Sequence, residues 1–103
     1  MRRKGSKSKS QRKHAFRRFT SRFDDELKRE DYENAINSIR TGKAEFFDRQ
    51  SNRVTRWKVE IHGIPIIAVY DTSRGTIVTF ITEDMAETSA VVREAIKSYR
   101  SLK

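Results

Sequence analysis

The spacing of apolar residues changes at Lys43, from a helical period of about 3.6 residues to the period of about two residues that is typical of β-strands. Segments typical of strands continue as far as Thr82, the last two being apolar on both faces, and a helical period returns from Glu83. A chain of 103 residues holds one ordinary domain. Helices followed by a run of strands therefore predict a single α+β domain.

The first expected helix covers residues 11–23. Four apolar residues at helical spacing form the side expected to face the core: Ala15, Phe16, Phe19 and Phe23. The opposite side is polar and basic: His14, Arg17, Arg18 and Ser21. Residues 1–10 consist mainly of Lys, Arg, Ser and Gly, and we expect them to form a disordered basic arm because they offer almost no apolar surface to bury. Residues 11–103 then form the folded domain.

Two more helices are expected. The second covers residues 31–40, with Asp31 as its N-cap and Gly42 in the left-handed position after its end. The third covers residues 83–102, and Thr82 suits the N-cap of this helix as well as it suits a functional site. One apolar stripe identifies the third helix: Val92, Ala95, Ile96, Tyr99 and Leu102.

Four strands are expected between the second and third helices, in an antiparallel meander that carries two N-terminal helices and is followed by the C-terminal helix. Their ranges are 44–49, 53–61, 64–70 and 76–82. His62 and Gly63 match a two-residue hairpin loop, since glycine readily adopts positive φ. Tyr70 is expected in the core.

The hairpin loops also predict the two faces of the sheet. Counting strand pairs outward from the loops places Trp57 on one face and Arg56 and Lys58 on the other. The same counting places Phe80 and Thr82 on the Arg56 face. The two N-terminal helices are expected to cover the Trp57 face, which would leave the Arg56 face partly open as a shallow groove.

The positive charge is concentrated at the N-terminus. The formal net charge is +9, and residues 1–22 hold ten Lys and Arg side chains and no acid, whereas the rest of the chain is nearly balanced. Such a cluster suits the phosphate backbone of RNA or DNA. A tail that only improves solubility is the alternative for residues 1–10.

Other features narrow the class of protein. The chain has no cysteine, which excludes disulfides and thiolate metal sites and favours the cytoplasm. It shows no apolar run long enough for a membrane span and no signal-peptide pattern, so no membrane partner is expected. No zinc, Walker or Rossmann motif is present, so neither metal nor cofactor is expected.

Metal-independent RNA cleavage requires an imidazole or a hydroxyl group to transfer protons, and nearby cations to stabilise the charged phosphorane. His14, with Arg17 and Arg18, would form the rim of the groove that Arg56 and Lys58 line. The alternatives for His14 are a phosphate contact or an ordinary surface residue. His62 suits a turn better than a site.

Two segments, KHAFRRFTSRF at residues 13–23 and VEIHGIPIIAVYDTSRGTIVTFIT at residues 59–82, resemble the small RelE/ParE-related proteins of bacteria and phages. The resemblance is closest to the branch whose first helix has a His followed by Arg residues. Nine residues match its pattern: His14, Ala15, Arg18, Phe19, Arg22, Phe23, Ile77, Val78 and Thr79. The resemblance implies a fold shared with barnase-like, colicin-type and RelE-type ribonucleases, many of which cleave RNA without metal.

The resemblance also implies roles for single residues. The implied catalytic set contains a proton carrier, two phosphate stabilisers and a supporting hydroxyl, in this order: His14, Arg18, Arg56 and Thr82. The resemblance implies a backbone clamp at Lys58, and the basic N-terminal cluster adds four residues expected to bind nucleic acid: Arg12, Lys13, Arg17 and Arg22. The chain departs from the RelE-type pattern in its long final helix. If this helix lay on the open face of the sheet, it would bury the residues of the expected groove.

Three functions follow as hypotheses. The first is an RNA-directed nucleic-acid-binding protein with toxin-like ribonuclease activity, with the ribosome or an antitoxin-like protein as further partners. The second is a non-catalytic bacterial or phage regulator that uses the same basic surface. The third is a module that binds an acidic protein through its final helix.

Overall fold

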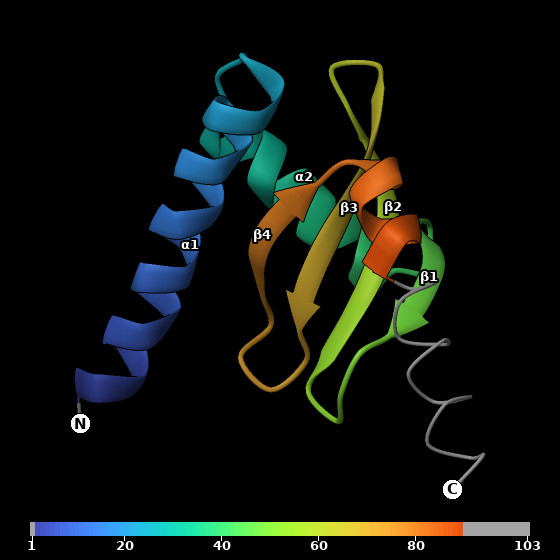
Figure 1. Cartoon of the computed structure of the whole chain (residues 1–103). Coiled ribbons are helices and arrows are strands. Elements are labelled where there is room, and N and C mark those ends of the chain that lie inside the picture. Colours follow the sequence, from blue (N-terminus) through green and yellow to red (C-terminus); the bar gives the residue numbers. More distant parts are fainter. Residues whose placement is uncertain (1, 90–103) are drawn as a thin grey trace, which may run out of the picture.

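The computed structural model describes residues 2–89 of the chain, and its architecture is the α+β fold that the periodicity predicts (Figure 1). The helices are α1 (Arg2–Phe23) and α2 (Arg29–Arg40), and residues 83–89 are also helical. The strands are β1 (Glu45–Arg49), β2 (Val54–Ile61), β3 (Ile64–Asp71) and β4 (Thr76–Ile81). They form one antiparallel sheet in the order β1-β2-β3-β4. No helix within residues 2–89 has the length and apolar composition needed to cross a membrane.

The helix α1 is longer than predicted, because it begins at Arg2 and not at Gln11. The expectation of a disordered arm is therefore wrong for residues 2–10. Once a helix is nucleated and docked, each further residue adds one hydrogen bond for one ordered backbone unit, and Lys and Arg are good helix formers. The acid-free segment thus continues one basic helix.

The helix α2 begins at Arg29, so Asp31 is its third residue and not its N-cap. The Asp31 carboxylate accepts a hydrogen bond from the backbone N–H of Lys28 at 3.0 Å, which is the reciprocal contact of a capping box. The end of α2 is as predicted, since Gly42 follows with a φ of 81°.

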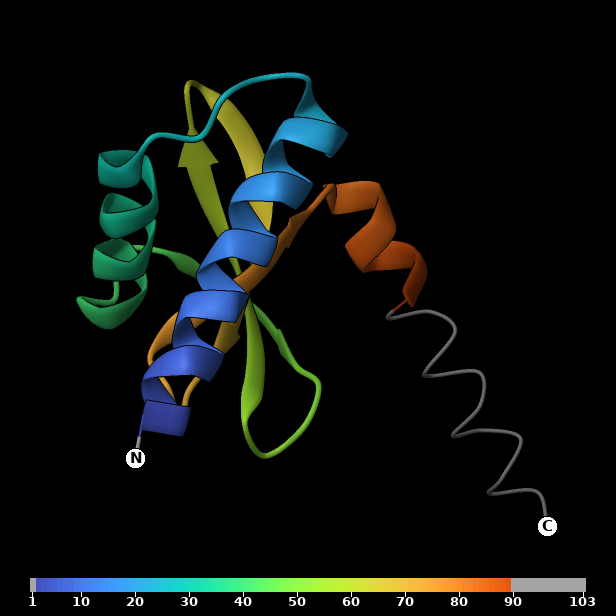
Figure 2. The ribbon, with the colours of Figure 1, turned by 90° about the vertical axis from the view of Figure 1, so that its left-hand side faces the viewer.

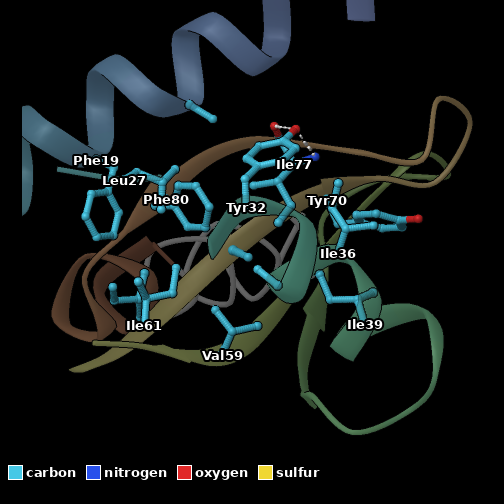
Figure 3. Packing of buried hydrophobic residues seen from close by; sticks show 14 residues of the cluster. Phe19, Leu27, Tyr32, Ile36, Ile39, Val59, Ile61, Tyr70, Ile77 and Phe80 are labelled. Atoms are coloured by element: carbon cyan, nitrogen blue, oxygen red, sulfur yellow. Dashed lines mark hydrogen bonds between the residues drawn. The ribbon is translucent and has the colours of Figure 1, made fainter. Parts of the chain in front are cut away.

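The core lies between the sheet and the two N-terminal helices (Figure 3). Phe19 of α1 and Tyr32 of α2 are fully buried against the sheet, and the Tyr32 hydroxyl donates to the Ile77 carbonyl and accepts from the Ile77 N–H, both at 2.9 Å. Trp57 packs against the same cluster. The prediction that α1 and α2 cover the Trp57 face is therefore confirmed, and so is the burial of Tyr70.

The first hairpin has the predicted register. His62 and Gly63 have φ values of 53° and 77°, as a tight two-residue turn requires, and Trp57 pairs with Ala68 and Arg56 with Val69. Six further pairs extend this ladder from Val54 to Ile61. A turn with both central residues at positive φ matches the twist of the two strands that it joins.

The second hairpin differs from the prediction by one residue. Tyr70 pairs with Ile77 as expected, but Val69 pairs with Thr79, so Val78 is an extra residue in β4. Phe80 therefore lies opposite Ala68 and is fully buried beneath the helices. The prediction that Phe80 lies on the Arg56 face is wrong, because one inserted residue moves every later side chain to the other face.

On the Arg56 face, the prediction of an open groove at Arg56 is wrong, because Arg56 is buried. The helix of residues 83–89 crosses this face, on the opposite side of the sheet from α2 (Figures 1 and 2). Ile67 of β3 and Ala86 of this helix are both fully buried. The apolar stripe predicted from Val92 to Leu102 lies outside the described residues.

Candidate nucleic-acid interface

Arg56 has a structural role in a buried ion pair with Asp48. The residue is 1% exposed, and its guanidinium forms two parallel hydrogen bonds to the Asp48 carboxylate, from Nε at 2.7 Å and from Nη2 at 2.6 Å. It also donates to Ser89 Oγ at 2.8 Å and to the Ala86 carbonyl at 3.3 Å, and it lies 5.1 Å from the centre of the Phe47 ring. Arg56 thus joins β1, β2 and the last described helix, and no phosphate can reach it in this arrangement.

Two other candidates contact the helix of residues 83–89 and are also engaged. The Lys58 ammonium lies 2.8 Å from the Glu83 carboxylate, and the hydrogen bond and charge of Glu83 raise the pKa of Lys58. The Thr82 hydroxyl accepts a hydrogen bond from the Met85 N–H at 3.0 Å. Of the two roles considered for Thr82, the structure therefore shows the N-cap.

Arg22 and Arg12 anchor α1. The Arg22 guanidinium donates to the Phe80 carbonyl at 2.8 Å and to Thr79 Oγ1 at 3.1 Å, which ties the end of α1 to β4, and burial lowers its pKa. Arg12 pairs with Glu33 at 2.9 Å and lies over the ring of a buried tyrosine of α2. Both residues were predicted to bind nucleic acid, and both are held by the protein itself.

The other basic residues of α1 from Lys9 onward are exposed. Because the apolar side of α1 docks against β4, its opposite side points away from the sheet (Figure 2). Within residues 9–23, four exposed cations make no ion pair with any described carboxylate: Lys9, Lys13, Arg17 and Arg18. We call these four residues the outer surface of α1.

His14 lies on α1 beside these cations and is half-buried. Burial lowers its pKa, and the positive charges of Arg18, Arg17 and Arg22 lower it further, so the imidazole is neutral near neutral pH. Arg56 lies on the opposite face of the sheet. The four catalytic candidates, namely His14, Arg18, Arg56 and Thr82, are therefore not brought together, and the active site implied by the resemblance is not assembled in the described part of the chain.

A basic groove of about 760 Å³ runs along one flank of α1, next to the first residue of α2. Five of its seven lining side chains are cationic and the other two are a hydroxyl and an aromatic ring: Lys9, Arg12, Lys13, Arg17, Arg29, Ser10 and Phe16. Arg29 is exposed and, like the outer surface of α1, it pairs with none of the carboxylates that the structure describes.

Sequence reasoning missed four residues of this groove. Lys9 and Ser10 were assigned to the arm and Phe16 to the core, while Arg29 had no assigned role. The spacing of Lys9, Lys13 and Arg17 at steps of four residues was a visible signal, since such residues share one side of a helix. No local pattern brings Arg29 to α1, because that approach depends on how the two helices pack.

A second hollow, of about 590 Å³, lies between α2 and the β1 and β2 strands. Its lining mixes acids and bases, including Glu45, Glu60 and Lys43, so it does not favour a polyanion. At its edge the His62 ring holds two carboxylates, with Nδ1 2.8 Å from Asp25 and Nε2 3.0 Å from Asp31. These contacts raise the pKa of His62, whose role is structural, as expected for a turn residue.

Comparison with protein-family models, with curated proteins and with solved structures finds no match to this chain. The RelE/ParE resemblance stays a prediction. Among residues 2–89 no group of His, Asp and Glu side chains is arranged to hold a metal ion.

Proposed function

We propose that this protein binds nucleic acid in the cytoplasm through the outer surface of α1, with RNA as the target that the resemblance implies. One observation carries the proposal. The four cations of the outer surface of α1 have no carboxylate partner in the described part of the protein, whereas Arg56 and Lys58 of β2 each have one.

No described carboxylate pairs with Lys13, Arg17 or Arg18, so small ions from solution balance these charges. A phosphate backbone replaces those ions, and their release drives association. Because the contacts are made to phosphate, binding of this kind depends steeply on salt and only weakly on base sequence.

Binding is favoured over cleavage because the candidate catalytic groups are apart. A general acid or base must lie within hydrogen-bond reach of the same substrate as the groups that stabilise the phosphorane. His14 and Arg56 occupy opposite faces of the sheet, and Arg56 is enclosed by Asp48 and Ser89. The proposal is therefore the non-catalytic one.

The experiment is a titration of labelled RNA with the full chain at several salt concentrations, followed by fluorescence anisotropy. We expect log affinity to fall linearly with log salt, and Lys13→Ala and Arg17→Ala each to reduce the slope by about one unit or slightly less. Lys43→Ala removes an equal charge from the loop after α2 and should leave the slope unchanged.

Two outcomes would change the proposal. Failure to bind RNA or DNA at low salt would remove it and would favour an acidic protein as the partner. Loss of intact RNA in the presence of EDTA, with His14→Ala abolishing the loss, would restore the ribonuclease hypothesis. We expect intact RNA and no effect of His14→Ala on binding.

A further inference from the structure

The basic groove differs from the rest of the basic surface in two respects, its concave shape and its aromatic side chain. A duplex keeps its bases stacked inside and presents phosphates on a convex outer surface. A single strand can place its backbone along a groove and turn a base toward an aromatic ring. The shape and composition of the groove are therefore informative about the form of nucleic acid that it takes.

We propose that the basic groove is a binding site for single-stranded nucleic acid, with the backbone along α1 and one base against Phe16. The proposal rests on the proposed function and adds to it both a location and a ligand class. Its distinctive residues are Phe16 and Arg29, neither of which belongs to the outer surface of α1.

The cations of α1 have a suitable spacing. Lys9, Lys13 and Arg17 lie at successive steps of four residues, which correspond to about 6 Å each along a helix. This step is comparable to the distance between neighbouring phosphates of a single strand. A row of three cations can therefore contact successive phosphates without bending the strand.

The aromatic side chain is held in place before any ligand arrives. Phe16 stacks on Tyr32 with ring centres 5.3 Å apart and an angle of 27° between the planes, and it remains partly exposed as part of the groove lining. Arg12, also in the groove, is fixed by Glu33 and lies 5.1 Å from the centre of the Tyr32 ring. Side chains that are already ordered lose little entropy when they bind a base.

Arg29 supplies the second wall. It is the first residue of α2, so a contact to Arg29 requires a ligand that occupies the groove and does not merely approach α1 from outside. Arg29 is exposed, and its removal from a helix N-terminus takes away an unfavourable charge, so Arg29→Ala should fold normally. This variant therefore tests occupancy of the groove.

The experiment measures the anisotropy of labelled oligouridine and oligothymidine of about 12 nucleotides, and of RNA and DNA duplexes of similar length, with the full chain. We expect the single strands to bind about tenfold more tightly than the duplexes. Arg29→Ala should weaken single-strand binding about fivefold and lower the salt slope by about 0.7, while Lys43→Ala, with the same charge change, should do neither. The two single strands distinguish RNA from DNA as the source of the shared chemistry.

Phe16→Leu keeps an apolar side chain at the core and removes the aromatic ring. We expect it to weaken single-strand binding about tenfold and to leave duplex binding unchanged. If thermal melting shows that Phe16→Leu is unfolded, Arg29→Ala decides alone. The single-strand site is overturned if duplexes bind with equal affinity, or if Arg29→Ala behaves like Lys43→Ala. In either case the effect of Lys13→Ala on the salt slope still tests the proposed function. Absence of binding to every oligonucleotide overturns both.

Discussion

Arg56 and Arg17 carry the same charge in opposite surroundings. Arg56 lies on β2 directly opposite Asp48 of β1, is almost fully buried, and has its charge balanced by that carboxylate. Arg17 lies on a helix that begins in an acid-free segment, is exposed, and makes no ion pair with the described residues. The comparison teaches that the supply of nearby carboxylates, and not the number of cations, separates a structural arginine from one available to a ligand.

The largest effect is expected at the buried ion pair. Arg56→Ala removes the two hydrogen bonds that the guanidinium donates to the Asp48 carboxylate and creates a cavity, so the free energy of unfolding should fall by about 3–5 kcal/mol. Urea denaturation followed by circular dichroism measures it. Arg17→Ala, the matched variant, should change the same quantity by less than about 0.5 kcal/mol. Equal losses for the two variants would break the comparison.

Asp71 is the next test, because its carboxylate is the centre of another paired cluster. It is nearly buried, which raises its pKa, but hydrogen bonds from Gln11, Ser73 and Arg74 outweigh the burial and bring the pKa to about 2. A depressed pKa stabilises the fold above the ordinary pKa, and this contribution is lost as pH falls toward about 2. Asp71→Asn should therefore cost about 2 kcal/mol at neutral pH.

The pH dependence checks this assignment. Unfolding of the wild-type chain and of Asp71→Asn, measured in urea at several pH values, should give curves that differ at neutral pH and converge below the ordinary pKa. A constant difference across the whole range would mean that the Asp71 charge is not the source of the stabilisation.

A smaller effect is expected at Arg17, and it concerns the affinity for RNA. Arg17→Ala should weaken RNA binding about fivefold at low salt and leave stability unchanged, because one phosphate contact is lost and no protein contact is. The ratio of the two affinities should approach unity as salt rises, and anisotropy at two salt concentrations measures it. A salt-independent loss would point to a contact other than phosphate.

The smallest effect is expected at His62, whose ring lies between Asp25 and Asp31 at an exposed turn. Its pKa is raised in the folded protein, so its stabilising contribution is complete below the ordinary histidine pKa and is lost as pH rises through the raised value. His62→Asn keeps a residue that accepts positive φ and removes the charge. The variant should be less stable than wild type in mild acid and equal to it in mild alkali, as thermal melting can show.

The sequence by itself determined the element types, the strand order and the first hairpin, because these depend on periodicity and on turn residues that are close in the chain. It also located the excess of positive charge, since an acid-free segment remains acid-free in any fold. It did not show where α1 begins, because Ser and Gly in residues 5–10 weaken the helical signal while continuation from a docked helix overrides it.

Only the tertiary structure decided which basic residues are available to a ligand. The extra residue Val78 moved Phe80 into the core, and the helix of residues 83–89 covered Arg56, so the predicted groove on the sheet became a buried ion pair. The approach of Arg29 to α1 created a different groove on the other side of the molecule. These outcomes depend on contacts between residues distant in the chain, and local spacing carries no information about the partner that each charge will meet.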